Sequence, residues 1–431
     1  MSIHRAITNK KTTDGFENVF RGLGQGRDIT SNARFKTNRL ISTVWQELDD
    51  LYTSNWIASK AIDIPVDDAL KDDRIFQSEE SEKLEAFKNA LEDFDIDNKI
   101  AQALKWSRVF GSAFLILVTD DDTMDRPLNI KRVKNLSNIA VLDRFDVYAD
   151  ALERNPLSPR YLEPEYYMLT KQGAKIHHTR VIKIDGVVTT NNRKEQLGGY
   201  GLSLFERIFK TILNADASPT LLINLLEQSN IDVFKILGLN EALSNDEDSL
   251  VLKRLQTIMT GKSVFNGVAL DAEDGYENIT KNFAGLGDIN KEFYQIVAGA
   301  AEIPFSRFMG AQLSGLNPTG EGELKTYYDK LISIQKRLVK TYNKIDEVLM
   351  MHLFGETFEY KWEFENLFKM TPQQIADIEN KNAQTKQIYL NMNVISEYEA
   401  KAGLIDNPLF PTITAETIEA EEALYNEVNE Y

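Results

Sequence analysis

Histidines and runs of acidic residues are the side chains of this sequence best suited to hold a metal ion or to transfer protons. The four histidines are His4, His177, His178 and His352. His177 and His178 are adjacent, so on a strand their side chains would point to opposite faces, and we expect a surface or strand-edge role for them. The acidic runs 120–122 and 246–248 could bind Mg²⁺, but no other ligand type is near them in sequence. We expect solvated turns there and no metal site.

Two glycine-rich segments could cradle a phosphate. GLGQGRD (22–28) follows no hydrophobic strand, so a flexible arm is the favoured interpretation. GLNPTGEGE (315–323) lacks the Lys and Ser/Thr of a phosphate-binding loop, and Glu321 and Glu323 would repel a nucleotide. The motifs HExxH, CxxC, GxxxxGK[ST] and GxSxG are all missing. The sequence therefore predicts no catalytic residue and no cofactor, and we expect that the protein is not an enzyme.

Composition narrows the class of protein further. The chain has 431 residues, which predicts two or three lobes or an elongated shape, and its 42% hydrophobic and 27% charged residues are typical of a folded protein. It contains no cysteine and no apolar run near the ~20 residues that span a bilayer, and its first 20 residues lack the apolar core of a signal peptide. The formal charge of −17 repels phosphate backbones, so tight binding of duplex DNA is not expected.

Hydrophobic periodicity predicts a mainly helical chain with a β-rich stretch. Residues 113–118 (AFLILV) are expected to form a buried strand, and 129–190 further strands. Other expected elements are helices through residues 45–52, 56–64 ending before Pro65, 84–94, 202–229 with Pro219 as a kink or boundary, 288–303 and 321–355, two strands joined by a turn within 262–279, and a helix starting at Pro372 with Thr371 as its N-cap. Between the helices ending near Pro304 and starting near Glu321 lies a Gly-rich segment. Mobile segments held by rigid elements tend to carry function.

Several segments, in order, resemble the portal proteins of tailed bacteriophages. The most specific is AAEIPFSRFMG (300–310) followed by GLNPTGEGELKTYYD (315–329). The others are SNWIASKAIDIPVDDALKD (54–72), WSRVFGSAFLILV (106–118), LDRFDVY (142–148), IHHTRVIKIDG (176–186), YGLSLFERI (200–208) and the stretch 370–400. The resemblance spans roughly residues 40–405.

The resemblance implies an α+β, mainly helical portal fold with a β-containing wing, a helical stem, a small α/β clip and a C-terminal helical crown. The implied parts are a flexible N-terminal arm (1–37), the wing (38–201), stem helix 1 (202–229), the clip (230–287), stem helix 2 (288–304), a tunnel loop (305–322), the long wing helix and following strand (323–370), and the crown with an acidic tail (371–431).

The resemblance also implies a function. Portal proteins form rings, usually of twelve subunits, at one capsid vertex, through which double-stranded DNA is packaged and ejected. The implied partners are further copies of the chain, the DNA, the terminase large subunit, the major capsid protein and scaffold, and a head–tail adaptor, with no membrane. The implied location is the virion, with assembly in the host cytoplasm.

The tunnel loop is where such a ring would come closest to DNA. A few cations and backbone N–H groups there would touch phosphates without reading bases, with Arg307, Asn317 and Lys325 as the first candidates. The full set of candidate channel residues is Arg307, Gly310, Gly315, Asn317, Gly320, Gly322 and Lys325. Two alternatives stay open: a nucleotide-acting hydrolase of phage origin that uses an acidic turn, and another ring-forming head–tail connector component.

Overall fold

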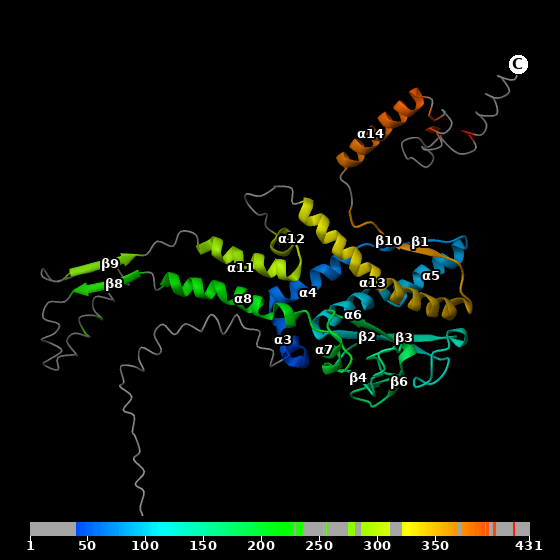
Figure 1. Ribbon diagram of the computed structural model, residues 1–431, viewed down its shortest axis with the longest axis horizontal. Coiled ribbons are helices and arrows are strands. Elements are labelled where there is room, and N and C mark those ends of the chain that lie inside the picture. The colour runs from blue at the N-terminus through cyan, green and yellow to red at the C-terminus, as the bar shows by residue number, and fades with distance from the viewer. Residues whose placement is uncertain are drawn as a thin grey trace, which may run out of the picture. The chain divides into compact units, whose positions relative to one another are not determined.

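The computed structural model describes residues 40–227, 230–235, 275–280, 286–310, 321–368 and 372–392, with residues 253, 256, 394–395, 400–401 and 417–418. The chain forms two compact units, Met1–Phe364 and Glu365–Tyr431, each considered by itself (Figure 1). The expected arm at 1–37, the acidic run 246–248 and most of the expected acidic tail lie outside the described residues.

Long helices and small antiparallel sheets make up the first unit, which confirms the predicted mainly helical α+β class. Its helices are η1 (Ile41–Thr43), α3 (Trp45–Ser54), α4 (Trp56–Ala69), α5 (Ser81–Asp93), α6 (Ile96–Phe110), η2 (Ile130–Arg132), η3 (His178–Arg180), α7 (Asn191–Gln196), α8 (Phe205–Glu227), α11 (Leu286–Ala301), α12 (Phe305–Met309) and α13 (Glu321–Phe354). Its strands are β1 (Arg74–Gln77), β2 (Ser112–Thr119), β3 (Leu136–Asp143), β4 (Val147–Ala149), β5 (Tyr166–Leu169), β6 (Lys175–His177), β7 (Val181–Asp185), β8 (Asn230–Lys235), β9 (Gly275–Thr280) and β10 (Lys361–Phe364). In the second unit the described helix is α14 (Pro372–Asn391), which starts at the predicted proline.

Strand β2 is the centre of the larger three-stranded sheet, whose order is β3-β2-β7. Leu115 lies opposite Val141 on one side and Ile182 on the other, in antiparallel register. Helix α6 packs on this sheet, and Phe114 and Ile116 of β2 pack in a core cluster with residues of the sheet β4-β5-β6, so both faces of β2 are covered and nearly all its residues are buried. The predicted buried strand at 113–118 is confirmed, because a strand covered on both faces can be apolar throughout.

Helix α4 continues through Pro65 to Ala69, so the prediction that it ends before Pro65 is wrong. A proline within a helix has no N–H to donate to the carbonyl four residues before it, which here belongs to Ala61. Arg108 of α6 supplies the missing donor, since its Nη2 lies 2.8 Å from Ala61 O. A side chain from a neighbouring helix therefore replaces the backbone bond that Pro65 removes.

In helix α8 the donor that replaces the missing proline N–H comes from the same helix. Pro219 lies inside the helix rather than at a boundary, and it leaves the carbonyl of Ala215 without a backbone donor. Ser218 Oγ donates to Ala215 O at 2.9 Å and also lies 2.6 Å from Asn290 Oδ1 of α11. The serine before the proline thus both completes the helix and joins α8 to α11.

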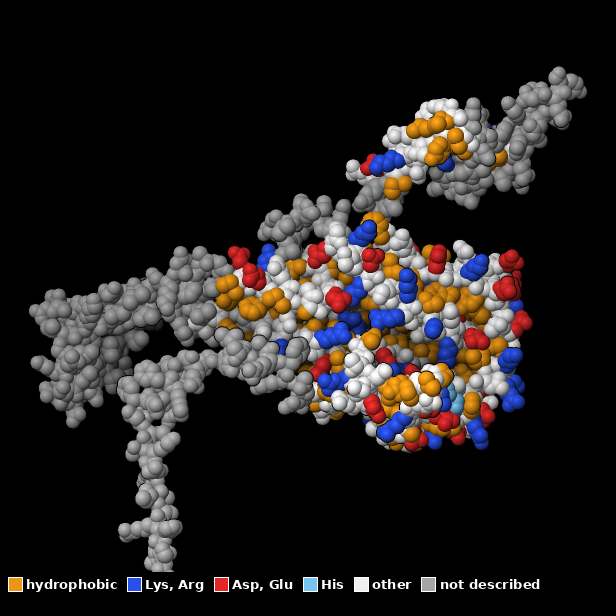
Figure 2. Space-filling view, viewed as in Figure 1, with side chains coloured by type: hydrophobic (Ala, Val, Ile, Leu, Met, Phe, Trp, Pro, Cys, Tyr) orange, Lys and Arg blue, Asp and Glu red, His pale blue; other side chains and the backbone are white. Residues whose placement is uncertain are grey.

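Helices α8 and α11 lie side by side, and each leads to one strand of a two-stranded antiparallel sheet, β8-β9 (Figure 1). Helix α8 falls within the predicted helix 202–229, and α11 begins two residues before 288. The prediction of a strand pair confined to 262–279 is wrong for residues 275–279, because β9 pairs with β8, which lies earlier in the chain. Figure 2 shows hydrophobic side chains on the surface of the helical pair.

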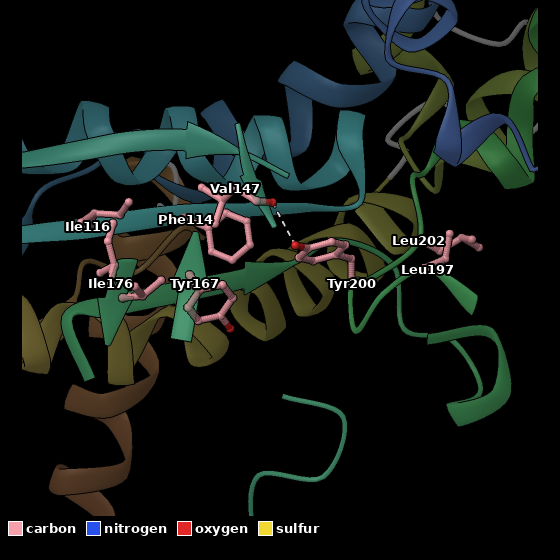
Figure 3. Close-up of a cluster of buried hydrophobic side chains, with 9 residues drawn as sticks. Phe114, Ile116, Val147, Tyr167, Ile176, Leu197, Tyr200 and Leu202 are labelled. Atoms are coloured by element: carbon pink, nitrogen blue, oxygen red, sulfur yellow. Dashed lines mark hydrogen bonds between the residues drawn. The ribbon is translucent and has the colours of Figure 1, made fainter. Parts of the chain in front are cut away.

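A core cluster joins the sheet β3-β2-β7 to the smaller sheet β4-β5-β6 (Figure 3). The ring of Phe114 on β2 lies 5.3 Å from that of Tyr167 on β5 and 6.0 Å from that of Tyr200. The hydroxyl of Tyr200 donates to Val147 O on β4 at 2.9 Å. Aromatic contacts and one buried hydrogen bond therefore hold the two sheets together.

Helix α13 has 34 residues and is the long amphipathic element that the sequence predicts. Its buried positions include Leu331, Ile334, Leu338, Tyr342, Ile345 and Leu349. On this face Asp346 accepts from Arg74 Nη1 of β1 at 2.7 Å and from Tyr360 Oη at 3.0 Å. The pair fixes β1 to the helix, and β1 in turn pairs with β10.

The sequence predicts a solvated turn at residues 120–122, and this prediction is wrong for Asp121. Its side chain is fully buried against that of Arg180, also fully buried, with Oδ1 and Oδ2 2.8 and 2.9 Å from Nη1 and Nη2. Thr119 Oγ1 and the N–H of Asn129 also donate to it, at 2.7 and 2.9 Å. The prediction fails because the partner of Asp121 lies 59 residues away.

His177 and His178 do not point to opposite faces, so that prediction is also wrong. Strand β6 ends at His177 and η3 starts at His178, so the chain turns between them and the ring centroids lie only 4.4 Å apart. His177 is buried and ends β6, an edge strand of the sheet β4-β5-β6, so the expected strand-edge position is found and the surface position is not. Burial lowers the pKa of both imidazoles. The neighbouring His178 lowers the pKa of His177 further, and Arg160 does the same for His178.

Three glycines meet where α6 passes into β2. The N–H of Gly186 donates to Gly111 O at 2.8 Å. A Cβ atom on Gly201 would lie 2.5 Å from the same oxygen, and Gly111 itself has a φ of +95°. The close backbone contact and the left-handed conformation both require glycine at this junction.

Candidate functional site

The segment 305–322, expected to be a loop, begins with a helix. Phe305 and Phe308 of α12 are three positions apart, so both rings face inward and are buried. Gly310 ends the helix with a φ of +69°, and its N–H donates to Ser306 O at 2.9 Å. At the other end, residues 321 and 322 already belong to α13. The loop prediction is therefore wrong for 305–309 and 321–322, and residues 311–320 lie outside the described structure.

Asp68 of α4 ties α12 and α13 together. Arg307 Nε and Nη2 of α12 lie 3.1 and 2.9 Å from its two carboxylate oxygens. The hydroxyl of Tyr327 in α13 donates to the same carboxylate at 2.8 Å. The hydrogen bond to Asp68 raises the pKa of Arg307, while burial and then Asp68 raise the pKa of Tyr327. Three separate segments are thus joined through one carboxylate.

Two further contacts fix the ends of α12. Lys60 Nζ of α4 donates to Phe308 O at 3.0 Å, near the C-terminus of α12. A positive charge at this end of a helix is also stabilised by the helix dipole. At the N-terminus, Glu323 Oε1 of α13 accepts from the N–H of Phe305 at 3.2 Å. Because α4 and α13 hold both ends, they set where the chain enters residues 311–320.

The end of α11 is held in a similar way. Lys330 of α13 donates to Ala301 O at 3.1 Å and pairs with Glu302 Oε2 at 2.8 Å. The hydrogen bond from Lys330 lowers the pKa of Glu302, whose backbone has a positive φ of 57°. Close by, burial and then Arg337 lower the pKa of Arg108 to about 10. Together these residues form what we call the α12 anchor: Lys60, Asp68, Arg307, Glu323, Tyr327 and Lys330.

The described residues include no group of three or more His, Asp or Glu side chains placed to hold a metal ion. None of the described helices has both the length and the apolar character that crossing a membrane requires. The anchor contains paired charges and a neutral phenol, so its arrangement is suited to positioning a chain segment.

A sequence model of the phage portal protein family matches residues 46–388, from α3 to α14. The match covers well over half of the 431 residues. The chain belongs to the phage portal protein family. The resemblance found from the separate sequence segments is thereby confirmed.

Individual relatives of this portal-family chain are distant. An uncharacterized protein of Haemophilus influenzae is 27% identical over 416 residues, covering 94% of this chain and 93% of its own length. Two relatives named anti-CBASS protein Acb1, from Sphingomonas paeninsulae and a Caulobacter species, are 26% and 25% identical over 87% and 85% of this chain. The chain spans only 62% and 61% of the length of these two relatives.

Solved structures also resemble the chain at low identity. A structure of the neck of an empty gene transfer agent particle has a TM-score of 0.49 at 12% identity, covering 85% of this chain and 94% of that one. A crystal structure of an HK97-family phage portal protein from Corynebacterium diphtheriae has a TM-score of 0.39 at 10% identity, covering 74% and 95%.

The predicted channel residues of this portal-family chain fall into three groups. Arg307 and Gly310 lie on α12 and at its end, within or beside the anchor. Gly322 and Lys325 are exposed in the first turns of α13. Gly315, Asn317 and Gly320 lie outside the described residues. A contact between these residues and DNA stays a prediction, and the guanidinium of Arg307 is already paired with Asp68 within the chain.

Sequence reasoning missed Lys60, Asp68 and Tyr327. Lys60 and Asp68 stand two turns apart on a largely apolar helix, but the same helix carries Asp63 and Asp67, so the pattern did not single them out. What the sequence did not contain was the identity of the partner, because Arg307 lies 239 residues after Asp68.

Proposed function

We propose that this chain is the subunit of a portal ring at one vertex of a phage capsid. Double-stranded DNA passes through the ring during packaging and ejection. In this proposal the ring has twelve copies, docks the terminase large subunit and a head–tail adaptor, and lies among the major capsid protein and scaffold. It assembles in the host cytoplasm and stays in the virion.

The observation that carries the proposal is the family match over residues 46–388. It includes α12, α13 and every residue of the α12 anchor, so the part of the chain that would line a channel belongs to the matched region. The wing, stem, clip and crown boundaries given above are part of this proposal; the tunnel-loop boundary 305–322 is not, because residues 305–309 and 321–322 are helical.

Charge supports a channel that does not hold DNA. Each chain has a formal charge of −17, so a ring of identical chains repels a duplex and resists tight binding. The cation closest to residues 311–320 that forms part of the anchor, Arg307, is neutralised by Asp68 at 2.9 Å. Phosphate contacts would therefore be weak, as sliding requires.

Exposed apolar side chains on α8 and α11 support contacts between copies. Leu221 and Ile223 of α8 are 59% and 55% exposed, and Ile289 and Ile296 of α11 are 46% and 58% exposed. Leu221 and Ile223 are two positions apart and so lie on different sides of α8, which leaves both sides of the helix with exposed apolar side chains that other chains can contact. In a ring each such face would meet a different face of the next copy, because the contacts close by rotation.

Native mass spectrometry and electron microscopy of the purified chain test the ring. We expect a particle of about twelve times 49.1 kDa with a central hole. Leu221→Lys with Ile223→Lys should lower the fraction of rings, because two charges would be buried in each contact. Leu157→Lys is the matched control, since Leu157 is 91% exposed and lies far from α8 in sequence.

The results test two claims separately: that the chain forms a ring, and that α8 makes the contact between copies. A chain that remains monomeric at high concentration, with and without capsid and scaffold proteins, overturns the ring. A ring that forms equally well with both lysine substitutions overturns the contact through α8 and leaves the proposed ring unaffected.

To test the channel, residues 311–320 are replaced by a short Gly-Ser linker. We expect intact rings and impaired packaging or retention of DNA, and normal packaging would exclude a role for this segment.

A second candidate function comes from the relatives named anti-CBASS protein Acb1. Because this chain spans 62% of the first of them, the named role can belong to the portion that the chain lacks. The test is whether the chain alone counteracts CBASS in cells that carry it. The nucleotide-acting hydrolase and the other connector component remain alternatives, the first tested by incubating the chain with nucleotides.

A further inference from the structure

A cavity of about 530 Å³ lies against β5, η3, β7 and the middle of α13. This volume is within the ~300–1,000 Å³ range of pockets that hold small ligands. Leu128, Ile130 and Val181 are the aliphatic residues of its lining. Polar groups also line it, among them Tyr167 and Lys344. None of these residues belongs to the α12 anchor.

No carboxylate of the described residues forms an ion pair with Lys344. Among the described residues its Nζ has one hydrogen-bond acceptor, Val181 O, at the long distance of 3.4 Å. Burial alone lowers the pKa of Lys344 to about 8, with no opposing contribution from an acidic group. The neighbouring Lys183 differs, because it pairs with Asp185 at 3.1 Å and donates to Gly199 O at 2.7 Å.

Tyr167 supplies an unused hydroxyl in the same cavity. The residue is 4% exposed, and its ring packs on Phe114. In Figure 3 its hydroxyl points away from Phe114 and Val147, and no described protein group forms a hydrogen bond with it. The hydroxyl of Tyr200 in the same cluster does have a partner, Val147 O. Solvent reaches the hydroxyl of Tyr167 at the cavity, so it is free to donate to a ligand that enters there.

The remaining charged groups limit what the cavity can hold. Glu163 lines it and, after burial, is the next cause that raises the pKa of Tyr167, so the phenol stays a protonated donor. Burial and then Arg160 lower the pKa of His178, so this imidazole is neutral at pH 7. One unbalanced ammonium beside one carboxylate favours a ligand with a single negative charge over a dianion.

We propose that this cavity binds a carboxylate group on a short apolar stem. The carboxylate accepts hydrogen bonds from Lys344 Nζ and Tyr167 Oη, and the stem packs against Leu128, Ile130 and Val181. Two sources offer this chemistry: a free organic acid, or an aspartate or glutamate side chain of a neighbouring copy. The second source alone depends on the proposed ring.

Competitive acetylation of the full chain tests the proposal. The chain is treated at pH 7 with trace acetic anhydride, and the reaction of each lysine is quantified by mass spectrometry. Added butyrate should slow acetylation of Lys344 about tenfold, because a bound carboxylate that raises its pKa by one unit lowers the free amine by that factor. Exposed Lys325 is the internal control and should not change.

Two matched variants locate the effect. Tyr167→Phe removes the unused hydroxyl and keeps the ring, so butyrate should protect Lys344 several-fold less. Tyr200→Phe removes a hydroxyl from the same cluster that does not line the cavity, and protection should remain. Equal protection in both variants would contradict the role of Tyr167.

Other ions and the assembled state complete the test. If chloride at equal ionic strength protects as well as butyrate, or if inorganic phosphate protects better, the proposed carboxylate site is wrong. If Lys344 in assembled rings is protected before butyrate is added, a neighbouring copy supplies the carboxylate. If it reacts in rings as in single chains and butyrate protects it, the ligand is a free acid. The single-chain experiment stands whether or not rings form.

Discussion

Asp121→Asn should strongly destabilise the sheet β3-β2-β7. The substitution keeps the size of the side chain and removes its charge, while Arg180 stays fully buried opposite it. The amide would also present an N–H to one of the two guanidinium nitrogens that Asp121 now binds at 2.8 and 2.9 Å. A buried cation would therefore lose its partner and gain a repulsive contact.

The size of the effect follows from the burial of both groups. Breaking a buried ion pair by removing one partner costs about 3–5 kcal/mol of the free energy of unfolding. A solvated turn, as the sequence predicts for 120–122, would change it by no more than about 0.5 kcal/mol. The two accounts differ enough for one measurement to decide between them.

Hydrogen exchange followed by mass spectrometry is the suitable assay, because a chain of 431 residues is not expected to unfold in one step. Amides of β2 and β7 should exchange roughly 10²- to 10⁴-fold faster, since each ~1.4 kcal/mol is a factor of ten. Amides of α13 away from this sheet should change far less. Asp122→Asn is the control, because Asp122 is exposed and bonds only locally, to the N–H and hydroxyl of Thr123.

The same pair gives a pH dependence with a defined sign. Burial opposes ionisation of Asp121, but hydrogen bonds from Arg180, Asn129 and Thr119 are together stronger and hold its pKa below the usual value. The stability that this carboxylate contributes is therefore complete at neutral pH and is lost as the pH falls through its folded-state pKa. The difference between the native chain and Asp121→Asn should shrink below pH 4. Equal exchange of the two chains at pH 7 would refute the argument.

Two further predictions concern α4. Arg108→Met should destabilise α4 by about 1–3 kcal/mol, because the carbonyl of Ala61 is left buried without a donor. The loss should be clearly smaller in a Pro65→Ala background, where a backbone N–H is restored. Hydrogen exchange of the α4 amides in the four chains measures the difference, and equal losses in both backgrounds would contradict it. Asp68→Asn should speed amide exchange in residues 304–310. It should lower the stability of the whole chain by only about 1 kcal/mol, because Arg307 is half exposed and ion pairs of this kind are weak. Unchanged exchange in residues 304–310 would show that Asp68 does not hold α12.

Elements whose signal is local were predictable from the sequence. The apolar run at 113–118 and the repeat of buried positions along α13 each lie within one segment, and both predictions are confirmed. Features that depend on distant partners were not predictable in this way. Pro65 indicates a helix end in the sequence, but the helix continues because Arg108 donates a hydrogen bond to Ala61 O. Asp121 indicates a solvated turn, but it is buried because Arg180 pairs with it.

The candidate site follows the same division. Arg307 and Gly310 could be singled out because glycine, proline and basic residues mark a segment between two helices. Asp68 could not, since a carboxylate on a helix surface is usually solvated, and only the packing of α12 between α4 and α13 makes it a shared acceptor. The anchor therefore belongs to the tertiary structure, although each of its residues is visible in the sequence.

The three glycines at the α6–β2 junction show why separate segments together identified the family. Gly111, Gly186 and Gly201 come from three segments that each resemble portal proteins only weakly. In the fold they share one backbone contact, in which Gly186 bonds Gly111 O and Gly201 leaves no room for a Cβ beside that oxygen. A side chain at any one of them would displace the other two, so the three segments are constrained jointly. Segments bound by one contact must occur together, which makes the set specific although no single member is.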